Sequence, residues 1–311
     1  MKRLLLMLLP AIPFIGFGQT LIPDANFEQE LINLGYDNIL DGSVITSNID
    51  TVTSLYLWGS NISNLTGIEG FTALTVLDCG GNQLTSFDVS NNIALTDLRC
   101  DNTQLTSLDV SNNMALIDLW CRNNQLTSLD VSQNTALIEF HCEYNQLTWL
   151  NVSGATVLTY LYCQSNQLTS LDLSTNTALT YLDCSDSKLT SLDVSQNTAL
   201  VELGCGSNQI TSLDVRNGNN MNLFINCFPN PNLTCISVDD STFSANNWTN
   251  IDPQHYFSDN CFLPAATEEH TTSNKLLKTI DILGRERKEI KNEPIFYIYG
   301  DGTVEKKIII E

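Results

Sequence analysis

Hydrophobic residues recur at a fixed spacing of 21 positions through the middle of the chain. One set is repeated in full by the next unit: Leu95, Leu98, Cys100, Leu105, Leu108 and Val110 become Leu116, Leu119, Cys121, Leu126, Leu129 and Val131. The alternating Leu-x-Cys part predicts a strand with Leu and Cys on one face. Because 21 residues cannot enclose a core alone, the units must stack on one another. The pattern therefore predicts a solenoid of parallel strands.

The second half of most units reads Leu-Asp-Val and also alternates with a period of two. This predicts a second extended segment opposite the first strand, since so short a unit leaves little room for a helix. Counted by their first core residues, nine coils begin near Val52, Leu74, Leu95, Leu116, Leu137, Leu158, Leu179, Leu200 and Asn222. The expected fold over residues 52–243 is a mostly β solenoid, with a parallel sheet on one face and extended segments opposite.

The complete unit, Leu-x-x-Leu-x-Cys-x-x-Asn-x-Leu, resembles the leucine-rich repeat, with Cys at a core position where Leu is commoner. The first coil, which contains Asn61 to Ile68, looks like the 22-residue repeat of the bacterial internalins. This resemblance covers about 190 of the 311 residues and implies a leucine-rich repeat solenoid.

The ten cysteines fall into two groups. Eight follow the repeat and are expected to form a structural ladder of buried, free thiols: Cys79, Cys100, Cys121, Cys142, Cys163, Cys184, Cys205 and Cys227. Side chains stacked in register point the same way and do not reach the torsion that a disulfide needs. A zinc site is disfavoured as well, because Cys142 points inward and His141 outward on the same strand.

Both ends of a stacked solenoid need to be covered. At the amino end, residues 19–51 are predicted to form a cap that contains one amphipathic helix, with Asp24 as its N-cap and a glycine at its end. At the other end, Cys235 and Cys261 leave the repeat spacing, which favours a disulfide in a cap over residues 244–264. Two separate thiols are the alternative.

Residues 1–18 have the order of a secretory signal peptide: Lys2 and Arg3, an apolar run, and small residues before Gln19. The run of roughly 15 apolar residues is shorter than the ~20 that a membrane span needs, although a retained anchor stays an alternative. Because no later segment is long and apolar enough, the mature protein is expected to have no transmembrane span.

Charge separates the end of the chain from the rest. The formal net charge is −21, and phosphate binding needs clustered Lys and Arg, so a nucleic-acid partner is excluded on charge grounds. Residues 19–265 contain 4 basic and 26 acidic groups, whereas residues 266–311 contain 8 and 9. The tail is therefore predicted to be a separate module.

The tail has alternating apolar segments, an Asp-x-Leu-Gly-Arg stretch at Asp281–Arg285 and a Lys-Lys-Ile-Ile ending. Residues 265–311 resemble the type A C-terminal sorting domain of the type IX secretion system of Bacteroidota. This resemblance implies that the type IX secretion machinery is a partner of the protein. It also implies that the protein is secreted or held at the outer cell surface. The alternative is a degenerate final hairpin of the solenoid.

The search for catalytic motifs finds little. The chain has three histidines and contains neither Gly-x-Ser-x-Gly nor His-Glu-x-x-His. No glycine loop suited to phosphate follows a predicted strand. We therefore expect no catalytic residue, no cofactor and no metal site, and a protein that is not an enzyme.

Outward positions on the Leu-x-Cys strands vary from coil to coil while the inward positions do not. Such side chains lie about 4.8 Å apart on neighbouring strands, and Trp, Tyr and Arg often dominate binding energy. We hypothesise a surface that binds a protein or glycan, made of Arg99, Trp120, Arg122, His141, Tyr160, Tyr162, Tyr181 and Asp183. The alternative is that the aromatic residues pair across strands simply to stabilise the sheet.

Two further columns of residues face outward on the other side of each coil. An aspartate column, interrupted by Asn151, repels itself unless its charge is offset: Asp88, Asp109, Asp130, Asp172, Asp193 and Asp214. We favour hydrogen bonds within each turn over calcium bridging between coils. The threonine column from Thr85 to Thr211 could bind ice, but the hydrated aspartates beside it disfavour that function.

These features together predict an exported, acidic, non-enzymatic leucine-rich repeat protein that acts as a recognition or adhesion module. The runner-up is a structural surface-layer component without a discrete ligand. The fold by itself does not name the ligand.

Overall fold

The computed structural model describes residues 18–261, 276–280, 285–286, 288, 294–299 and 304–308. These residues fall into two compact units, one that ends at Cys261 and one that holds β18 (Leu276–Ile280), β19 (Pro294–Tyr299) and β20 (Val304–Ile308). In the second unit, β19 pairs antiparallel with both other strands. The predicted signal peptide, except for Gly18, and most of the predicted sorting domain lie outside the described residues.

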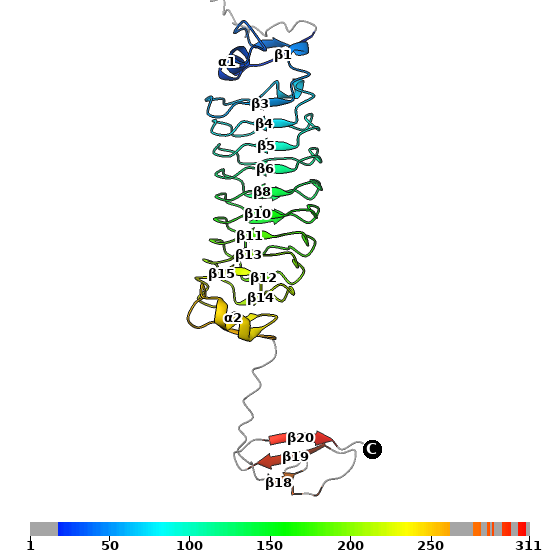
Figure 1. The fold of residues 1–311 in the computed structure, drawn as a ribbon, viewed down its shortest axis with the longest axis vertical. Coiled ribbons are helices and arrows are strands. Elements are labelled where there is room, and N and C mark those ends of the chain that lie inside the picture. Colours follow the sequence, from blue (N-terminus) through cyan, green and yellow to red (C-terminus); the bar gives the residue numbers. More distant parts are fainter. Residues whose placement is uncertain are drawn as a thin grey trace, which may run out of the picture. The chain divides into compact units, whose positions relative to one another are not determined.

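In residues 18–261, a parallel sheet of nine strands runs along one side of the solenoid (Figure 1). Each strand has three residues and comes from a different coil: β3 (Ser54–Tyr56), β4 (Val76–Asp78), β5 (Asp97–Arg99), β6 (Asp118–Trp120), β8 (Glu139–His141), β10 (Tyr160–Tyr162), β11 (Tyr181–Asp183), β13 (Glu202–Gly204) and β15 (Phe224–Asn226). Neighbouring strands pair in register, so Leu55, Leu77 and Leu98 lie in one row. One repeat unit therefore makes one coil, as the spacing predicts.

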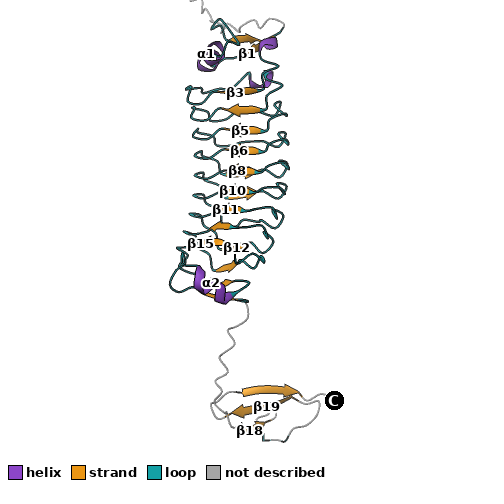
Figure 2. Cartoon of the chain, in the orientation of Figure 1, coloured by secondary structure: helices purple, strands orange, loops and turns teal. Residues whose placement is uncertain are grey.

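The opposite side of the coils has an interrupted set of strands, and loops and turns make up much of each coil (Figure 2). Here β7 (Ser128–Asp130) pairs with β9 (Trp149–Asn151). A second parallel sheet follows farther along: β12 (Ser191–Asp193), β14 (Ser212–Asp214), β16 (Cys235–Ser237) and β17 (Tyr256–Ser258). The predicted extended segments are present, but they pair in places and not along the whole solenoid.

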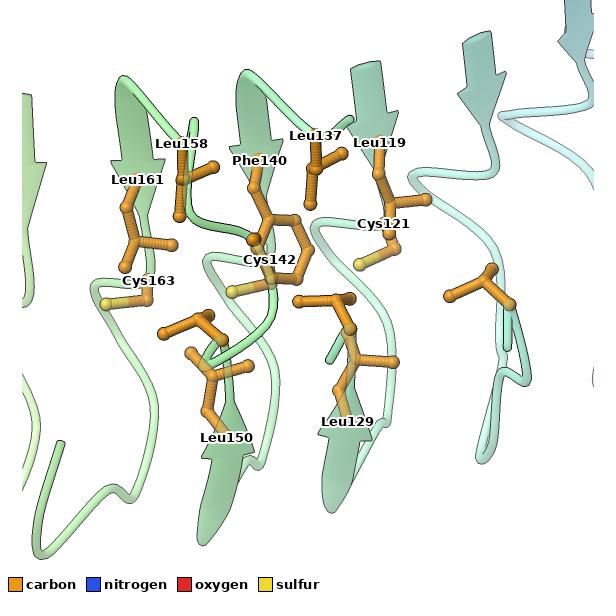
Figure 3. Close-up of a cluster of buried hydrophobic side chains, with 14 of the residues drawn as sticks. Leu119, Cys121, Leu129, Leu137, Phe140, Cys142, Leu150, Leu158, Leu161 and Cys163 are labelled. Carbon is orange, nitrogen blue, oxygen red and sulfur yellow. The ribbon is translucent and has the colours of Figure 1, made fainter. Parts of the chain in front are cut away.

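Leucines and cysteines from both sides of the coils meet in one core (Figure 3). Cys121, Cys142 and Cys163 lie at the ends of sheet strands and point into the coil interior, where Leu129 and Leu150 enter from the other side. All eight in-frame cysteines are free and buried, and burial raises the pKa of each thiol. Because the thiolate is the reactive form, these thiols are inert while the coils stay stacked.

Buried asparagines join neighbouring coils where the chain turns. Nδ2 of Asn124 donates to the carbonyls of Cys100 and Cys121 at 2.9 and 3.1 Å, and its Oδ1 accepts from the N–H of Leu105 at 2.9 Å. The same row contains Asn82, Asn145, Asn166, Asn208 and Asn230. A second row includes Asn134, whose amide donates to two carbonyls of the preceding coil. These bonds satisfy backbone groups that would otherwise be buried without a partner.

The amino-terminal segment packs on the first coil. Its elements and those that follow are β1 (Gln19–Leu21), α1 (Ala25–Asn33), β2 (Ser43–Ile45) and the 3-10 turns η1 (Thr46–Asn48) and η2 (Ile68–Gly70). Asp24 caps α1 by accepting from the N–H groups of Asn26 and Phe27, and its second oxygen accepts from Ser63. The rings of Phe27 and Phe71 stack at 6.3 Å. The helix is thereby fixed to the solenoid by both polar and apolar contacts.

The segment after β15 closes on the other end of the repeats. It contains α2 (Ser241–Asn247), and a disulfide joins Cys235 to Cys261. Nε1 of Trp248 donates to the carbonyl of Leu223 at 3.0 Å, and the indole meets the Phe257 ring edge-on. These contacts tie the segment to the core of the last coils.

Candidate functional site

Five neighbouring strands place one side chain each in a row on the outward face of the nine-stranded sheet. Strand pairing sets Arg99, Trp120, His141, Tyr162 and Asp183 side by side in that order. The guanidinium carbon of Arg99 lies 4.7 Å from the Trp120 ring centre. The ring centres of Trp120 and His141 are 4.4 Å apart, and those of His141 and Tyr162 are 4.2 Å apart. The row is therefore a continuous stack, which we call the aromatic row.

Two tyrosines from the adjacent positions extend the aromatic row. Tyr160 and Tyr181 face each other on β10 and β11, and the ring centre of Tyr181 lies 4.6 Å from that of Tyr162. Burial, with the charges of Asp183 and Glu202, raises the pKa of Tyr181 to about 12. Tyr160 is 41% exposed and offers its ring and hydroxyl to solvent.

His141 differs from the expectation of an exposed side chain. It is 8% exposed, because the rings of Trp120 and Tyr162 stack on it from both sides. Its Nε2 lies 2.7 Å from Oε1 of Glu139, and its Nδ1 lies 3.6 Å from Oε1 of Glu143. Burial alone lowers the pKa of His141, but the nearby carboxylates of Glu143 and Glu139 outweigh it and raise the pKa. His141 is therefore a buried residue that holds the rings of Trp120 and Tyr162 in position and has little contact with solvent.

Arg122 and Asp183 are also held by neighbouring groups. Nε of Arg122 lies 3.6 Å from Asp101 and its Nη1 lies 3.5 Å from Glu143, both of which are buried carboxylates. The Arg122 guanidinium carbon lies 5.1 Å from the ring centre of Trp120 in the aromatic row. Asp183 accepts from the N–H and hydroxyl of Ser185. The aromatic row is therefore stabilised by ion pairs and hydrogen bonds as well as by stacking.

Sequence reasoning missed two exposed aromatic residues on the first coil, Tyr56 and Trp58, which are 62% and 53% exposed. Tyr56 lies beside Asp78 in the register of the aromatic row. A Cβ on Gly80 would lie 2.3 Å from the Trp58 ring, so the indole rests on the backbone of the next coil. The signal was in the sequence: Leu55-Tyr56-Leu57-Trp58 puts both residues at outward positions.

On the opposite side, the charge of the aspartate column is offset within each turn. Oδ1 of Asp109 accepts from the N–H of Ser111 at 2.9 Å. The same bond to the residue two positions later recurs at Asp88, Asp130, Asp172, Asp193 and Asp214. Bonds from the following serines lower the pKa of Asp88, Asp109 and Asp172. These are the turn-internal bonds that the sequence favours.

The side chains of the aromatic row are better suited to contacting a ligand than to catalysing a reaction. They stack, donate and accept hydrogen bonds, and carry both charges. Across the described ranges, no group of three His, Cys, Asp or Glu side chains is placed to hold a metal ion. In the same residues, none of the helices has the length and apolar character to cross a membrane.

Comparisons with known proteins bear on the fold. No family model matches the chain. Internalin J of Listeria monocytogenes is 38% identical over 70 residues, which make up 22% of this chain and 8% of that protein. The functional domain of InlJ from Listeria monocytogenes, described as including a cysteine ladder, is 30% identical; the match covers 77% of this chain and 60% of that one, with a TM-score of 0.42. A leucine-rich repeat protein of Leptospira interrogans is 22% identical, with 68% and 55% covered and a TM-score of 0.53.

The chain spans less than two thirds of the length of each of these proteins. The likeness to the Leptospira structure concerns the fold, and it agrees with the in-register strands and the inward Leu and Cys rows described above. The chain therefore has the fold of a leucine-rich repeat solenoid.

Proposed function

We propose that the chain is a recognition or adhesion module that binds a protein or glycan through the outward face of its nine-stranded sheet. One observation carries the proposal: inward residues repeat as Leu and Cys, whereas outward residues vary along the sheet, as in the series Arg99, Trp120 and His141. Strand pairing is a backbone interaction and holds the sheet whichever outward residues are present. The outward residues are thus available for contact with a partner, on the extended kind of surface that solenoids use for binding.

The exposed aromatic residues are the contact residues in this proposal. Tyr56, Trp58 and Tyr160 present large, rigid rings that can also donate a hydrogen bond. Trp120 and Arg99 lie on the same face, between the first coil and Tyr160. Arg99 stacks on Trp120, and Trp120 stacks on His141, which holds both side chains in place. Cross-strand stacking of Trp120, His141 and Tyr162 stabilises the sheet at the same time, so the more exposed Tyr160 is the residue that separates recognition from stability.

We further propose that residues 1–18 are a signal peptide and that residues 265–311 direct type IX secretion. Both proposals rest on the sequence motifs. Export would bring the sheet face to the outer cell surface or the medium, where partners are met. In the competing proposal, a structural surface-layer component, the same repeats would bind no ligand saturably.

The test is a binding screen with the full chain against an oligosaccharide array and a panel of host and bacterial surface proteins. We expect saturable binding to at least one probe, and Tyr160→Ser should weaken it by about tenfold with an unchanged melting temperature. Met114→Thr is the control: it lies outside the nine-stranded sheet and installs the residue that other coils have as Thr135 and Thr177, so it should leave binding to that probe intact. Lack of saturable binding, or a lowered melting temperature without loss of binding, would contradict the proposal.

A further inference from the structure

One coil breaks the repeat on the side opposite the nine-stranded sheet. At the position two residues before the aspartate column, the coils have Ser86, Ser107, Ser128, Trp149, Ser170, Ser191 and Ser212 in turn. The coil with Trp149 also has Asn151 in the aspartate column and Gly154 at a position that is polar in the other coils. Three departures within six residues of so regular a sequence indicate a feature special to this coil.

Gly154 brings the backbone of this coil unusually close to its neighbour. A Cβ at this position would lie 1.7 Å from the carbonyl oxygen of Ser132, so no other residue fits without moving the chain. Ser132 belongs to the preceding coil and lines a pocket beside Trp149. The glycine is therefore part of how the two coils shape that pocket.

The pocket has a volume of about 350 Å³, near the lower end for sites that hold small ligands. Its walls include the Trp149 indole, two carboxylates, four serines and one amide, and the ring is 50% exposed. Half-buried Leu108 and buried Leu129 contribute apolar surface. The lining thus combines one aromatic ring with a dense set of hydrogen-bonding groups.

The two carboxylates are held in place and keep acceptor capacity. Oδ1 of Asp109 and of Asp130 accepts from the N–H of Ser111 and Ser132, at 2.9 and 2.8 Å. Both side chains are exposed, so the second oxygen of each can accept from a ligand hydroxyl. No Lys, Arg or His lines this pocket, and the carboxylates would repel an anionic sugar.

We propose that the Trp149 pocket binds a neutral hexose unit of a glycan. A sugar ring presents C–H groups to the indole and hydroxyls to the carboxylates, the serines and the amide. The pocket lies on the Leu-Asp-Val side of the coils and shares no residue with the aromatic row. A cationic side chain would also be attracted to the carboxylates, but it would leave most of the serine hydroxyls without a role.

The test is titration calorimetry of the full chain with neutral gluco-, manno- and galacto-oligosaccharides as probes. We expect saturable binding of at least one probe. Trp149→Ser installs the residue of the neighbouring coils, so the fold should be kept, and affinity should fall by about tenfold or more. Tyr144→Ser is the matched control, because Tyr144 is 54% exposed, belongs to neither the pocket nor the aromatic row, and is replaced by the residue that the next coil has as Ser165; it should change affinity by less than about twofold.

Asp130→Asn provides a second variant that keeps the turn, because the amide oxygen can still accept from Ser132 as that of Asn151 does from Ser153. It should weaken binding by roughly three- to tenfold. Binding should be insensitive to added salt, since the ligand is uncharged. The proposal is overturned if no neutral oligosaccharide binds saturably, if Trp149→Ser has no effect, or if only cationic peptides bind and salt abolishes their binding.

Discussion

The two sides of each coil are stabilised in different ways. On the sheet side, nine strands pair in a continuous ladder and the outward residues vary. On the opposite side the pairing is interrupted, and the outward aspartates repeat together with one bond to the turn that follows. Sequence variation is therefore tolerated where a continuous ladder of backbone hydrogen bonds holds the chain, and restricted where a side chain completes the turn.

The coil with Trp149 fits this comparison as well. Trp149 and Asn151 lie in β9, which pairs with β7, so the opposite side departs from its repeat at a place where strands do pair. Asn151 still accepts from the N–H of Ser153, so the turn bond survives the loss of the charge. Pairing permits the departure in β9 but does not require it, because β7, β12 and β14 also pair and keep Ser-Leu-Asp.

The largest expected effect concerns the row of buried asparagines that joins neighbouring coils. Asn124→Ala removes the amide from the carbonyls of Cys100 and Cys121 and the acceptor from the N–H of Leu105. We expect the free energy of unfolding, measured by urea denaturation, to fall by about 2–4 kcal/mol. Gln125→Ala at the exposed neighbouring position should change it by less than about 0.5 kcal/mol. Similar small losses for both variants would contradict the role of this row.

A matched pair of aspartates compares the two sides directly. Bonds from Ser111 lower the pKa of Asp109, whereas burial and the charges of Glu139 and Asp97 raise the pKa of Asp118 on the sheet side. Asp109→Ala should cost about 1 kcal/mol, because it removes the turn bond. Asp118→Asn should leave the melting temperature unchanged or raise it, because it removes a charge that the fold disfavours. Equal losses in thermal unfolding would show that the two sides do not differ.

A smaller effect is the pH dependence of stability from His141. Its pKa is raised above 6.5, so the stabilising contribution of the imidazolium is complete below pH 6.5 and is lost as pH rises through the raised pKa. The melting temperature of the unmodified chain should fall over that interval. His141→Phe keeps a ring between Trp120 and Tyr162 and should remove this slope. The same slope in both proteins would assign it to other groups.

The fold could be predicted because the 21-residue spacing fixes which residues face inward, and Leu, Cys and Val at those positions leave one way to stack. The features that escaped prediction depend on contacts between coils. The burial of His141, the Trp58 ring resting on Gly80 and the close approach of Gly154 to its neighbour come from contacts between groups 21 or 22 positions apart. The periodicity predicts the row to which a residue belongs, but it does not predict how much of that side chain its neighbours bury.

The central claim is that one repeat unit forms one coil, which sets every inward and outward row at once. Alkylation with iodoacetamide, read by mass spectrometry, tests it most directly. The account predicts that the eight in-frame thiols stay unmodified in the folded chain and that all eight react after unfolding in guanidinium without reductant. Rapid alkylation of these thiols in the folded chain, or disulfides between neighbouring ones, would contradict it.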